Sequence, residues 1–351
     1  MYIRIYQRKY HLIEITTKFT CALALIYICL PHRFASHYNY LSLKQIENAL
    51  VSQVTHNITL QHLDECSYGD ILAENRYMYR AQYREEILRS EEILSGGEYY
   101  PEKCRARFST AIIVPYRQRE EQLHSFLIYM HNYLRHQRIH YRIFLIEQYD
   151  QKPFNRAKLF NIGSNIAAEY GFPCLIFSDV DLLPLNLGSL YVCTQLPRHM
   201  CSALDMWRFN LPYTGLFGGV VSIRTEQFRV VNGMSNLYEG WGGEDDDFYE
   251  RLQARNIDIC RFSPELSEFT MLRHKPEEKN ENRVALLRAG VLRHKMDGLN
   301  SLMYDEKERR IHNLKSDIGY DLSKVQNQEN LKYPDDSKQL NCVHRLDLFD
   351  C

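Results

Sequence analysis

Two kinds of apolar pattern alternate between residues 111 and 177, and this alternation limits the possible folds more than any other feature. Short apolar runs at Ala111–Val114, Tyr141–Gln148 and Cys174–Phe177 are typical of buried strands. The segments between them, 123–134 and 155–170, repeat their apolar residues at helical spacing. A strand–helix–strand–helix–strand order predicts a parallel sheet with right-handed crossovers.

Two carboxylates, Asp179 and Asp181, follow the third of these strands. Residues at the carboxyl end of a strand in an open α/β sheet face the crevice where ligands bind. If the extended geometry continues to Asp179, alternation points both side chains the same way. Two carboxylates at close range repel each other, which costs free energy unless a cation or a shared proton offsets the repulsion. The pair indicates a ligand or metal site, although a polar loop after a strand would also account for it.

Three arginines are expected at the same edge of the sheet. Arg117 and Arg119 follow Pro115, where we expect the first strand to break, and Arg156 opens the second helix. Guanidinium groups and helix N-termini both bind phosphate well. A single arginine is more often a surface residue, but three of them beside a carboxylate pair indicate a nucleotide diphosphate and a metal ion.

Consecutive acids, Glu244–Asp247, follow a tryptophan that is flanked by glycines. The glycines allow unusual backbone dihedrals around Trp241, and the indole offers a flat face to a sugar. Phe248 and Leu252 continue at helical spacing, so we expect the acids to open a helix, where negative charge is favoured. An acidic helix cap is the structural alternative.

Met271 and His274 are three residues apart, so they can share one face of a helix or turn. Histidine is a common metal ligand, whereas methionine is a soft and weak one. Taken alone, such a pair is more often core packing than a metal site.

The N-terminal stretch indicates the compartment. Basic residues precede a short apolar run, Phe19–Leu30, as in a secretory signal peptide or a signal anchor. The positive-inside rule would then place the rest of the chain in the lumen, and a buried amphipathic segment is the alternative. The sequon Asn57–Thr59 and ten cysteines without a CxxC pair fit a lumenal protein. The formal net charge of −1 gives no electrostatic case for nucleic-acid binding.

Together these motifs resemble those of the β1,4-galactosyltransferase family, glycosyltransferase family 7. The resemblance runs from about Cys104 to Tyr304 and keeps the family's order. The matching motifs are Val114–Arg119, Phe154–Lys158, Ser178–Leu182, Phe217–Gly219, Gly240–Asp247, Met271–His274 and Asp297–Leu302. The resemblance implies a single catalytic domain with the α/β GT-A fold, the Rossmann-like fold of nucleotide-diphosphosugar transferases, and an inverting, Mn²⁺-dependent Golgi enzyme.

The resemblance also implies roles for individual residues. Those implied to hold UDP are Pro115, Tyr116, Arg117, Arg119, Phe154 and Arg156. Those implied to bind Mn²⁺ are Asp181, Met271 and His274. Those implied to lie at the donor sugar are Asp179, Val180, Leu216, Gly219 and Glu244.

On the acceptor side, the resemblance implies that Asp245 is the general base on a 4-hydroxyl, with Asp246 and Tyr213 positioning the acceptor sugar. Trp241 is implied to lie on a mobile loop that closes over the donor, with a second mobile loop after His274. The implied disulfides are Cys66–Cys104 and Cys174–Cys193.

One departure from the family concerns the donor. Leu216 stands before Phe217, where members specific for galactose resemble one another in having tyrosine, beside the 2-substituent of the donor sugar. Leucine is smaller and cannot donate a hydrogen bond, so it leaves room for an N-acetyl group. We therefore expect UDP-GalNAc to be used at least as well as UDP-Gal. A galactosyltransferase specific for UDP-Gal is the first alternative.

Other departures concern the loops and the acceptor. Glu239 replaces the family's usual tryptophan, and the residues implied to line the acceptor's N-acetyl pocket are Arg283, Val284 and Leu287, without the family's phenylalanine. Terminal β-GlcNAc on a glycoprotein or glycolipid glycan is the expected acceptor. A sugar-binding module that has lost catalysis is a remote alternative, because every implied catalytic carboxylate and metal ligand is present.

These predictions give a domain plan for a single-pass type II Golgi membrane protein with a lumenal catalytic domain. The expected segments are a cytoplasmic tail at 1–18, a signal anchor at 19–30, a stem at 31–62, a catalytic domain at 63–320 and a C-terminal tail at 321–351.

Overall fold

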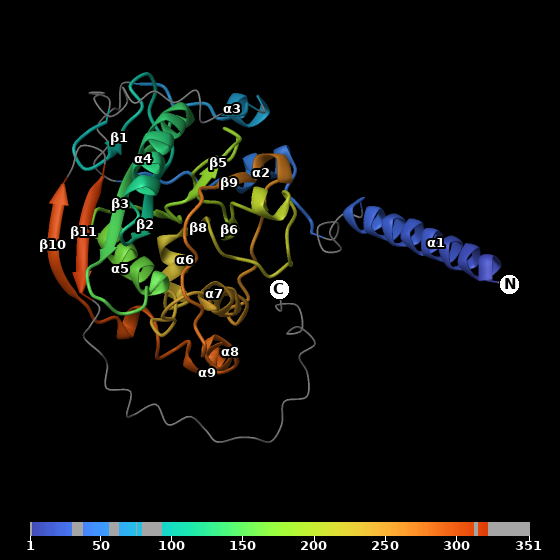
Figure 1. Cartoon of the computed structure of the whole chain (residues 1–351). Helices are drawn as coiled ribbons and strands as arrows, with labels where there is room; N and C mark the ends of the chain where they lie inside the picture. The colour runs from blue at the N-terminus through green and yellow to red at the C-terminus, as the bar shows by residue number, and fades with distance from the viewer. Residues whose placement is uncertain are drawn as a thin grey trace.

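A mixed sheet forms the centre of the molecule in the computed structural model, which describes residues 2–29, 38–55, 63–74, 76–78, 93–311 and 315–321 (Figure 1). Its parallel centre consists of β2 (Ser109–Tyr116), β3 (His140–Gln148) and β4 (Cys174–Phe177). The crossovers are α4 (Glu120–Leu134) and α5 (Arg156–Glu169). The predicted strand–helix–strand–helix–strand unit is confirmed.

The first strand does not break at Pro115, as we had expected. β2 continues through Pro115 and Tyr116, which pair with Ile146 and Glu147 of the parallel strand β3. The strand ends at Tyr116, and in the bend that follows Gln118 has a φ of +49°. Arg117 and Arg119 therefore flank a left-handed residue that directs the chain into α4.

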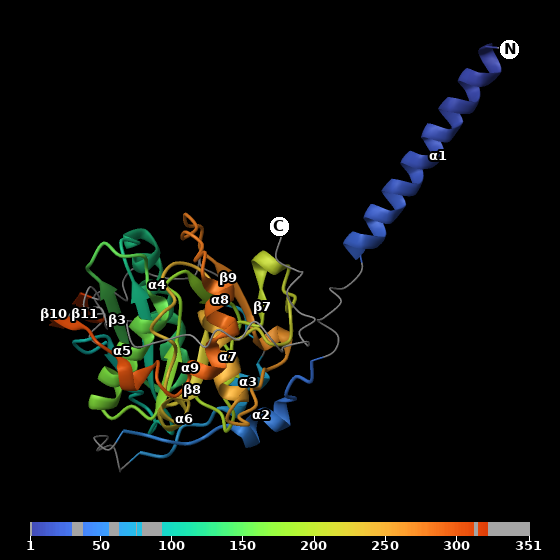
Figure 2. The same cartoon turned by 90° about the horizontal axis from the view of Figure 1, so that it is seen from below.

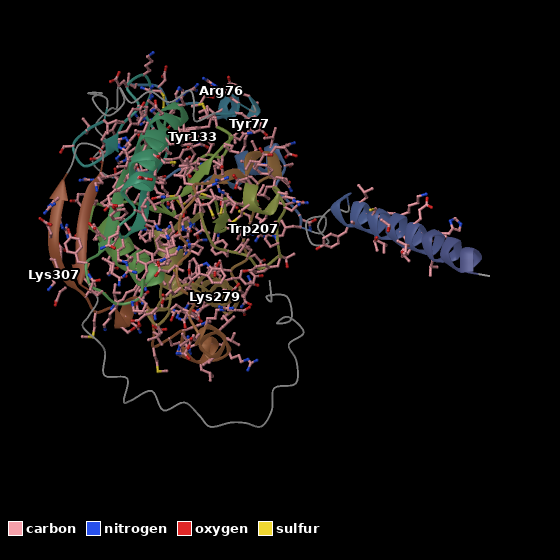
Figure 3. The ribbon with its side chains drawn as sticks, viewed as in Figure 1. Arg76, Tyr77, Tyr133, Trp207, Lys279 and Lys307 are labelled. Carbon is pink, nitrogen blue, oxygen red and sulfur yellow. A yellow bond between two sulfur atoms is a disulfide. The ribbon has the colours of Figure 1, made fainter. Side chains whose placement is uncertain are left out.

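Strands of the opposite direction extend the sheet on both sides. β8 (Val221–Arg224) and β6 (Arg198–His199) continue antiparallel beyond β4. On the other side, β11 (Ser316–Asp321) lies parallel to β3 and pairs with the outer strand β10 (Asp305–Ile311), where Figure 3 labels Lys307. The short β1 (Glu98–Tyr99) also pairs with β3. The sheet is thus mixed, and parallel only at its centre and in the β3–β11 pair.

A second, three-stranded sheet lies next to the first. It consists of β5 (Leu182–Pro184), β9 (Glu268–Met271) and β7 (Ala203–Leu204) in the order β5–β9–β7. Leu182 pairs with Met271 in this sheet, which places Met271 beside the residue that follows Asp181.

Apolar cores lie on both faces of the central sheet. Alternate residues of β2 point to opposite faces, so Ile112 belongs to the core that includes α4, and Ile113 belongs to the core that includes α5. The second core also takes in Phe248 of α7 (Glu244–Gln253).

The remaining described helices are α1 (Tyr2–Cys29), α2 (Leu43–Ala49), α3 (Gly69–Ala73), α6 (Thr225–Val230), α8 (Arg283–Arg288) and α9 (Gly290–Arg293). The described 3₁₀ turns are Arg135–Gln137, Asp205–Trp207, Pro264–Leu266 and Leu299–Ser301. Figure 2 shows α7, α8 and α9 on the side of the body that is seen from below.

Two findings concern the N-terminal part of the chain. Residues 19–29 of the apolar run belong to the long helix α1, and none of the described helices is long and apolar enough to cross a membrane. Residues 38–55, within the expected stem, pack on the domain: Ile46 is fully buried, and the Leu41 N–H donates to the carbonyl of Arg261 at 2.9 Å.

Both implied disulfides are formed. Cys66 joins Cys104, and Cys174 at the start of β4 joins Cys193. The sequon Asn57–Thr59 and the C-terminal residues 322–351 lie outside the described residues.

Candidate active site

Asp179 and Asp181 lie in the turn that joins β4 to β5. The extended geometry ends at Phe177, so the alternation we had considered does not govern the two side chains. Asp179 Oδ1 is 2.5 Å from Arg156 Nε, whereas Asp181 Oδ2 is 3.0 Å from Arg119 Nη1. Each carboxylate therefore has its own arginine, and Val180 between them is buried.

The charge of Asp181 is only partly relieved. Burial, and next the negative charge of Asp179, raise the pKa of Asp181, while His274 and Arg119 act in the opposite direction. The net shift is upward, so the site attracts further positive charge.

A divalent cation fits beside Asp181. His274 Nε2 lies 2.8 Å from Asp181 Oδ2, and the Leu272 N–H donates to the Asp181 carbonyl at 2.7 Å, which holds the strand carrying Met271 against this turn. Met271 ends β9 and His274 follows in a loop, not on a helix. Carboxylate and imidazole are suitable ligands for Mn²⁺, and the thioether is a weaker third. Among the described residues, no group of three or more His, Cys, Asp or Glu side chains could hold a metal ion. A three-ligand site beside Asp181 and His274 therefore needs the thioether of Met271.

Asp205 supports the strand that carries Met271, and our sequence reasoning missed it. Its Oδ1 accepts the Met271 N–H at 3.2 Å, and its Oδ2 accepts the Thr270 hydroxyl at 2.5 Å. Asp205 precedes Met271 by 66 residues. Only the pairing of β7 with β9 brings the two together, and no local motif marks that pairing.

Arg156 connects Asp179, Glu244 and Gly219. It is the first residue of α5, and besides Asp179 it reaches Glu244 Oε1 at 3.5 Å and the Gly219 carbonyl at 3.0 Å. The second oxygen of Glu244 is buried and has no hydrogen-bond partner. Buried polar atoms are rarely left unpaired in native structures, so a polar ligand group is expected there.

The predicted helix that the acids open is α7, and its first turn carries Glu244, Asp245, Asp246 and Asp247. Burial and then the charge of Asp245 raise the pKa of Glu244 to about 7, against the opposing effect of Arg156. Burial and Asp245 also raise the pKa of Asp246 to about 7, and burial raises that of Asp245. These carboxyl groups therefore share too little positive charge to ionise fully at neutral pH.

The loop before β8 lies against these acids. A Cβ on Gly218 would overlap Asp245 Oδ2, so glycine leaves the space that this carboxylate occupies. Gly219 has φ +68°, and a Cβ there would meet the Cys201 sulfur at 2.6 Å. The Tyr213 hydroxyl donates to Asp246 Oδ1 at 2.8 Å.

Leu216 is buried in the same loop. Its N–H donates to the Tyr213 carbonyl at 3.3 Å, and its own carbonyl accepts from the Arg261 guanidinium, which also reaches the Thr214 carbonyl at 3.1 Å. Arg261 was not among the residues we expected to matter. It fixes the backbone on which Leu216 and Tyr213 are carried.

Trp241 is exposed, with 52% of its surface accessible. Its N–H donates to the Glu278 carbonyl at 2.8 Å, and its carbonyl accepts the Asn280 N–H at 2.9 Å. The two segments expected to be mobile loops are therefore joined by backbone hydrogen bonds around Lys279, which Figure 3 labels. Gly240 permits this contact, because a Cβ there would lie 2.8 Å from the Glu278 carbonyl oxygen.

Arg117 has different partners from the other two arginines. It donates to the Lys152 carbonyl at 2.6 Å, lies 3.5 Å from Glu277 Oε1, and stacks on Phe154 with 5.4 Å to the ring centroid. Pro115 and Tyr116 are buried at the end of β2 beside it. The contacts thus bring most expected residues together at one sheet edge, but Arg117 and Trp241 belong to the loops around that edge.

Two family models match the chain. The N-terminal region of glycosyl transferase group 7 matches residues 70–194, and the N-terminal domain of galactosyltransferase matches residues 198–275.

Curated relatives carry the same family name. Beta-1,4-galactosyltransferase 1 of Bos taurus is 41% identical over 234 residues, which cover 65% of this chain and 58% of the relative. Beta-1,4-galactosyltransferase 2 of Homo sapiens is 38% identical over 236 residues, and beta-1,4-galactosyltransferase 4 of Cricetulus griseus is 41% identical over 224 residues. The matches span 63% and 65% of these two relatives, so the chain corresponds to less than two thirds of each curated protein.

A solved structure agrees with the fold. A mutant of Drosophila β1,4-galactosyltransferase 7, in complex with manganese, UDP-Gal and xylobiose, superposes with a TM-score of 0.53 at 28% identity. The match covers 61% of this chain and 93% of the solved chain.

Proposed function

The chain belongs to glycosyl transferase group 7, the β1,4-galactosyltransferase family, and we propose that it is an inverting, Mn²⁺-dependent hexosyltransferase that uses a UDP-sugar donor. The main support for this proposal is that two groups of ion-paired side chains lie together at one edge of the sheet. One set joins Asp181 to Arg119 and His274, and the other joins Arg156 to Asp179 and Glu244. The first suits a metal and a diphosphate, and the second suits the hydroxyl groups of a sugar.

For the donor diphosphate, we assign Mn²⁺ to Asp181, His274 and Met271. The solved Drosophila relative contains manganese and UDP-Gal, which supports this assignment. When bound, the ion would neutralise negative charge that develops on the departing UDP. Arg119 lies beside the same carboxylate and would add a second positive charge there.

For the chemical step, we assign Asp245 as the general base. It takes the proton from an acceptor hydroxyl while that oxygen bonds to the anomeric carbon and the bond from that carbon to UDP breaks, which inverts the anomeric centre. Its raised pKa makes it a stronger base than an exposed aspartate. Asp246, fixed by Tyr213, would position the acceptor sugar.

Replacing Asp245 tests this assignment. We expect Asp245→Asn to lower the transfer rate by roughly 10²- to 10⁴-fold in the presence of Mn²⁺, with little change in donor KM. Glu250→Gln is the matched control, because Glu250 is an exposed carboxylate on the same helix. Transfer that survives Asp245→Asn unchanged would remove the base assignment.

For the donor sugar, we propose that UDP-GalNAc is used at least as well as UDP-Gal. Leu216 supports this, because an aliphatic side chain at the position implied to face the 2-substituent leaves more room than tyrosine would. The names of the relatives favour the alternative of UDP-Gal specificity. Family membership alone therefore does not decide between the two donors.

Initial rates with the two donors decide this question. We expect the ratio of kcat/KM for UDP-GalNAc over UDP-Gal to be one or more, and to fall by at least about tenfold in Leu216→Tyr. Leu216→Ile, which keeps an aliphatic group of similar volume, should leave the ratio near that of the parent. A strong preference of the parent for UDP-Gal would overturn the donor assignment.

For the acceptor, we propose terminal β-GlcNAc on a glycoprotein or glycolipid glycan, joined through a β1,4 linkage. Arg283 and Val284 begin α8, and the Arg283 guanidinium lies 5.6 Å from the Trp241 ring centroid. This contact supports an N-acetyl pocket beside the loop that carries Trp241. A screen of glycosides that end in GlcNAc, Glc or Xyl would test it, since the solved Drosophila relative contains xylobiose.

For the location, we propose a Golgi membrane protein of type II with its catalytic domain in the lumen. The disulfides Cys66–Cys104 and Cys174–Cys193 support an oxidising compartment. Protease protection of a C-terminally tagged full chain in sealed Golgi vesicles tests the topology. Digestion of the tag without detergent would contradict it.

A further inference from the structure

Arg261 is a buried cation whose contact with the N-terminal part of the chain is an aromatic ring. The side chain is fully buried, and no carboxylate of the described residues forms an ion pair with it. Its guanidinium carbon lies 4.2 Å from the centroid of the Tyr38 ring. An aromatic face attracts a cation, and the attraction is stronger where water is excluded. The Tyr38 ring therefore offsets part of the free energy that burying this charge costs.

Tyr38 is itself fixed by hydrogen bonds between two distant parts of the chain. Its hydroxyl donates to the Ile259 carbonyl at 3.1 Å. The Leu41 N–H donates to the Arg261 carbonyl at 2.9 Å, and Leu41 forms a parallel bridge with Phe262. The segment that begins at Tyr38 thus runs beside the chain around Arg261 and leads into α2, which lies against the body (Figure 1).

Arg261 supports the loop that we assign to the donor sugar. Its Nη2 donates to the Thr214 carbonyl at 3.1 Å and also to the Leu216 carbonyl. Its Nε donates to His199 Nδ1 at 3.0 Å. The third nitrogen, Nη1, is buried and has no hydrogen-bond partner. Hydrogen bonds alone therefore leave part of the guanidinium unsupported, and the contact with the Tyr38 ring adds to them.

His199 extends this support to the glycines of the same loop. Burial, and next the charge of Arg261, hold the pKa of His199 well below its usual range, so its imidazole is neutral. Cys201 Sγ lies 3.6 Å from His199 Nε2. The Cys201 thiol donates to the Gly218 carbonyl at 3.4 Å, and its sulfur accepts the Val220 N–H at 3.0 Å. Arg261 and its neighbours thus contact the loop along most of its length.

We propose that Tyr38 is a positioning residue for the donor pocket and acts through Arg261 on the backbone of Leu216. A change in the position of Leu216 alters the room beside the 2-substituent of the donor sugar. The N-terminal segment, whose composition indicated a stem, would then influence the choice of donor. That last step rests on the proposed function, because it requires Leu216 to face the sugar. The support that Tyr38 gives to the loop does not depend on it.

Hydrogen–deuterium exchange of the full chain without any sugar tests the support of the loop. Tyr38→Phe keeps the aromatic face, whereas Tyr38→Leu removes it. Both variants lose the hydrogen bond to the Ile259 carbonyl, so the difference between them isolates the contact of the ring with the cation. We expect the amides of Leu216 and Val220 to exchange roughly 10-fold faster in Tyr38→Leu than in Tyr38→Phe.

Controls separate a local effect from a global one. Leu43→Ala changes an exposed residue of α2 and should leave exchange in the loop unchanged. The amides of β3 report the stability of the whole sheet and should exchange at the same rate in both Tyr38 variants. Equal acceleration in β3 would assign Tyr38 to global stability and overturn the proposal. Unchanged exchange in the loop of Tyr38→Leu would also overturn it.

Transfer rates test the step from the loop to the donor. The ratio of kcat/KM for UDP-GalNAc over UDP-Gal should change by about threefold or more in Tyr38→Leu and stay near the parent value in Tyr38→Phe. A purely structural role would lower the rates with both donors equally, and an unchanged ratio would overturn the influence on donor choice. A parent that transfers neither sugar would remove the proposed function, whereas faster exchange in the loop would still support the action of Tyr38 on Leu216.

Discussion

Single residues of the candidate site differ in how much opposite charge the fold gives them. Asp179 has Arg156 at 2.5 Å, whereas Glu244 shares the same arginine at 3.5 Å and keeps one buried oxygen unpaired. This arrangement destabilises the folded chain, because the buried Glu244 carboxylate has too few hydrogen bonds and positive charges to offset its lost hydration. Such strain is typical of sites that are complete only when a ligand is bound.

Replacing Glu244 with glutamine should therefore stabilise the ligand-free protein at alkaline pH. Because the pKa of Glu244 is raised from 4.5 to about 7 in the folded state, the folded chain binds more protons than the unfolded chain between these values, and stability falls as pH rises through that window. We expect Glu244→Gln to be more stable than the parent by roughly 1–3 kcal/mol at pH 8, with the difference vanishing below pH 4.5. Urea unfolding at both pH values measures this. A gap that widens on acidification contradicts the assignment.

Adding one methyl group at Gly218 should displace the proposed base. The Cβ would overlap Asp245 Oδ2, and a shift of about 1 Å in a reacting group can cost 10²-fold in rate. We expect Gly218→Ala to lose transfer activity by about that factor while remaining folded. Gly171→Ala is the control: its φ of +76° makes alanine strained, but no atom lies within 4 Å of the new Cβ. Steady-state rates per folded molecule, checked by circular dichroism, separate displacement from unfolding.

The sequence predicted single residues well where a motif is local, and failed where a contact is formed by distant segments. The carboxylates of the Asp179–Asp181 turn and the acids of α7 follow directly from strand and helix ends. His274 reaches Asp181 as the family resemblance implied. Asp205 and Arg261 could not be predicted, because only tertiary pairing brings their partners near them.

At the scale of elements, a buried cluster of ion-paired side chains anchors α7. Asp247 is fully buried and lies 2.6 Å from Arg251 Nε, and Arg251 also donates to the Asp297 carbonyl at 2.6 Å. The acids of the site occupy the same first turn of the helix. The cluster therefore fixes the position of Asp245 through the helix.

Removing one charge from this cluster should be strongly destabilising. Asp247→Asn leaves Arg251 and Arg293 buried with less negative charge, and breaking a buried ion pair in this way costs about 3–5 kcal/mol. Chemical denaturation measures the loss. Glu250→Gln, on the exposed side of the same helix, should change stability by no more than about 0.5 kcal/mol. Equal effects of the two variants would show that the cluster does not hold α7.

The elements themselves were predicted where apolar periodicity is strong. β3, β4, α4 and α5 appear close to their expected bounds, because each buries a continuous apolar run or stripe. β2 continues past Pro115 because the neighbouring parallel strand β3 still pairs with it there, a contact that the local proline signal does not reveal. β10 was not predicted because its sequence, DEKERRI, is almost entirely charged and its position is set by pairing with β11.

At the scale of the whole molecule, the folded body begins earlier in the chain than composition suggested. The segment 38–55 is polar and reads as a stem, yet the Val51 N–H donates to the Cys193 carbonyl at 3.2 Å, and the Thr55 N–H donates to the buried Ser109 hydroxyl at 3.0 Å. Its helix α2 is short and contributes one fully buried side chain, Ile46. A single anchoring residue gives too little periodicity for a sequence pattern to identify.

If this segment is part of the folded body, shortening Ile46 should destabilise the whole domain. Ile46→Ala would leave a cavity among buried side chains, and such changes cost roughly 2–5 kcal/mol. Leu43→Ala, on the exposed side of the same helix, should cost less than about 1 kcal/mol. Global unfolding followed by fluorescence measures both, and a single transition shifted by Ile46→Ala would show that the segment unfolds with the sheet. A true stem would give two equally small effects, because its side chains would be solvated before and after unfolding.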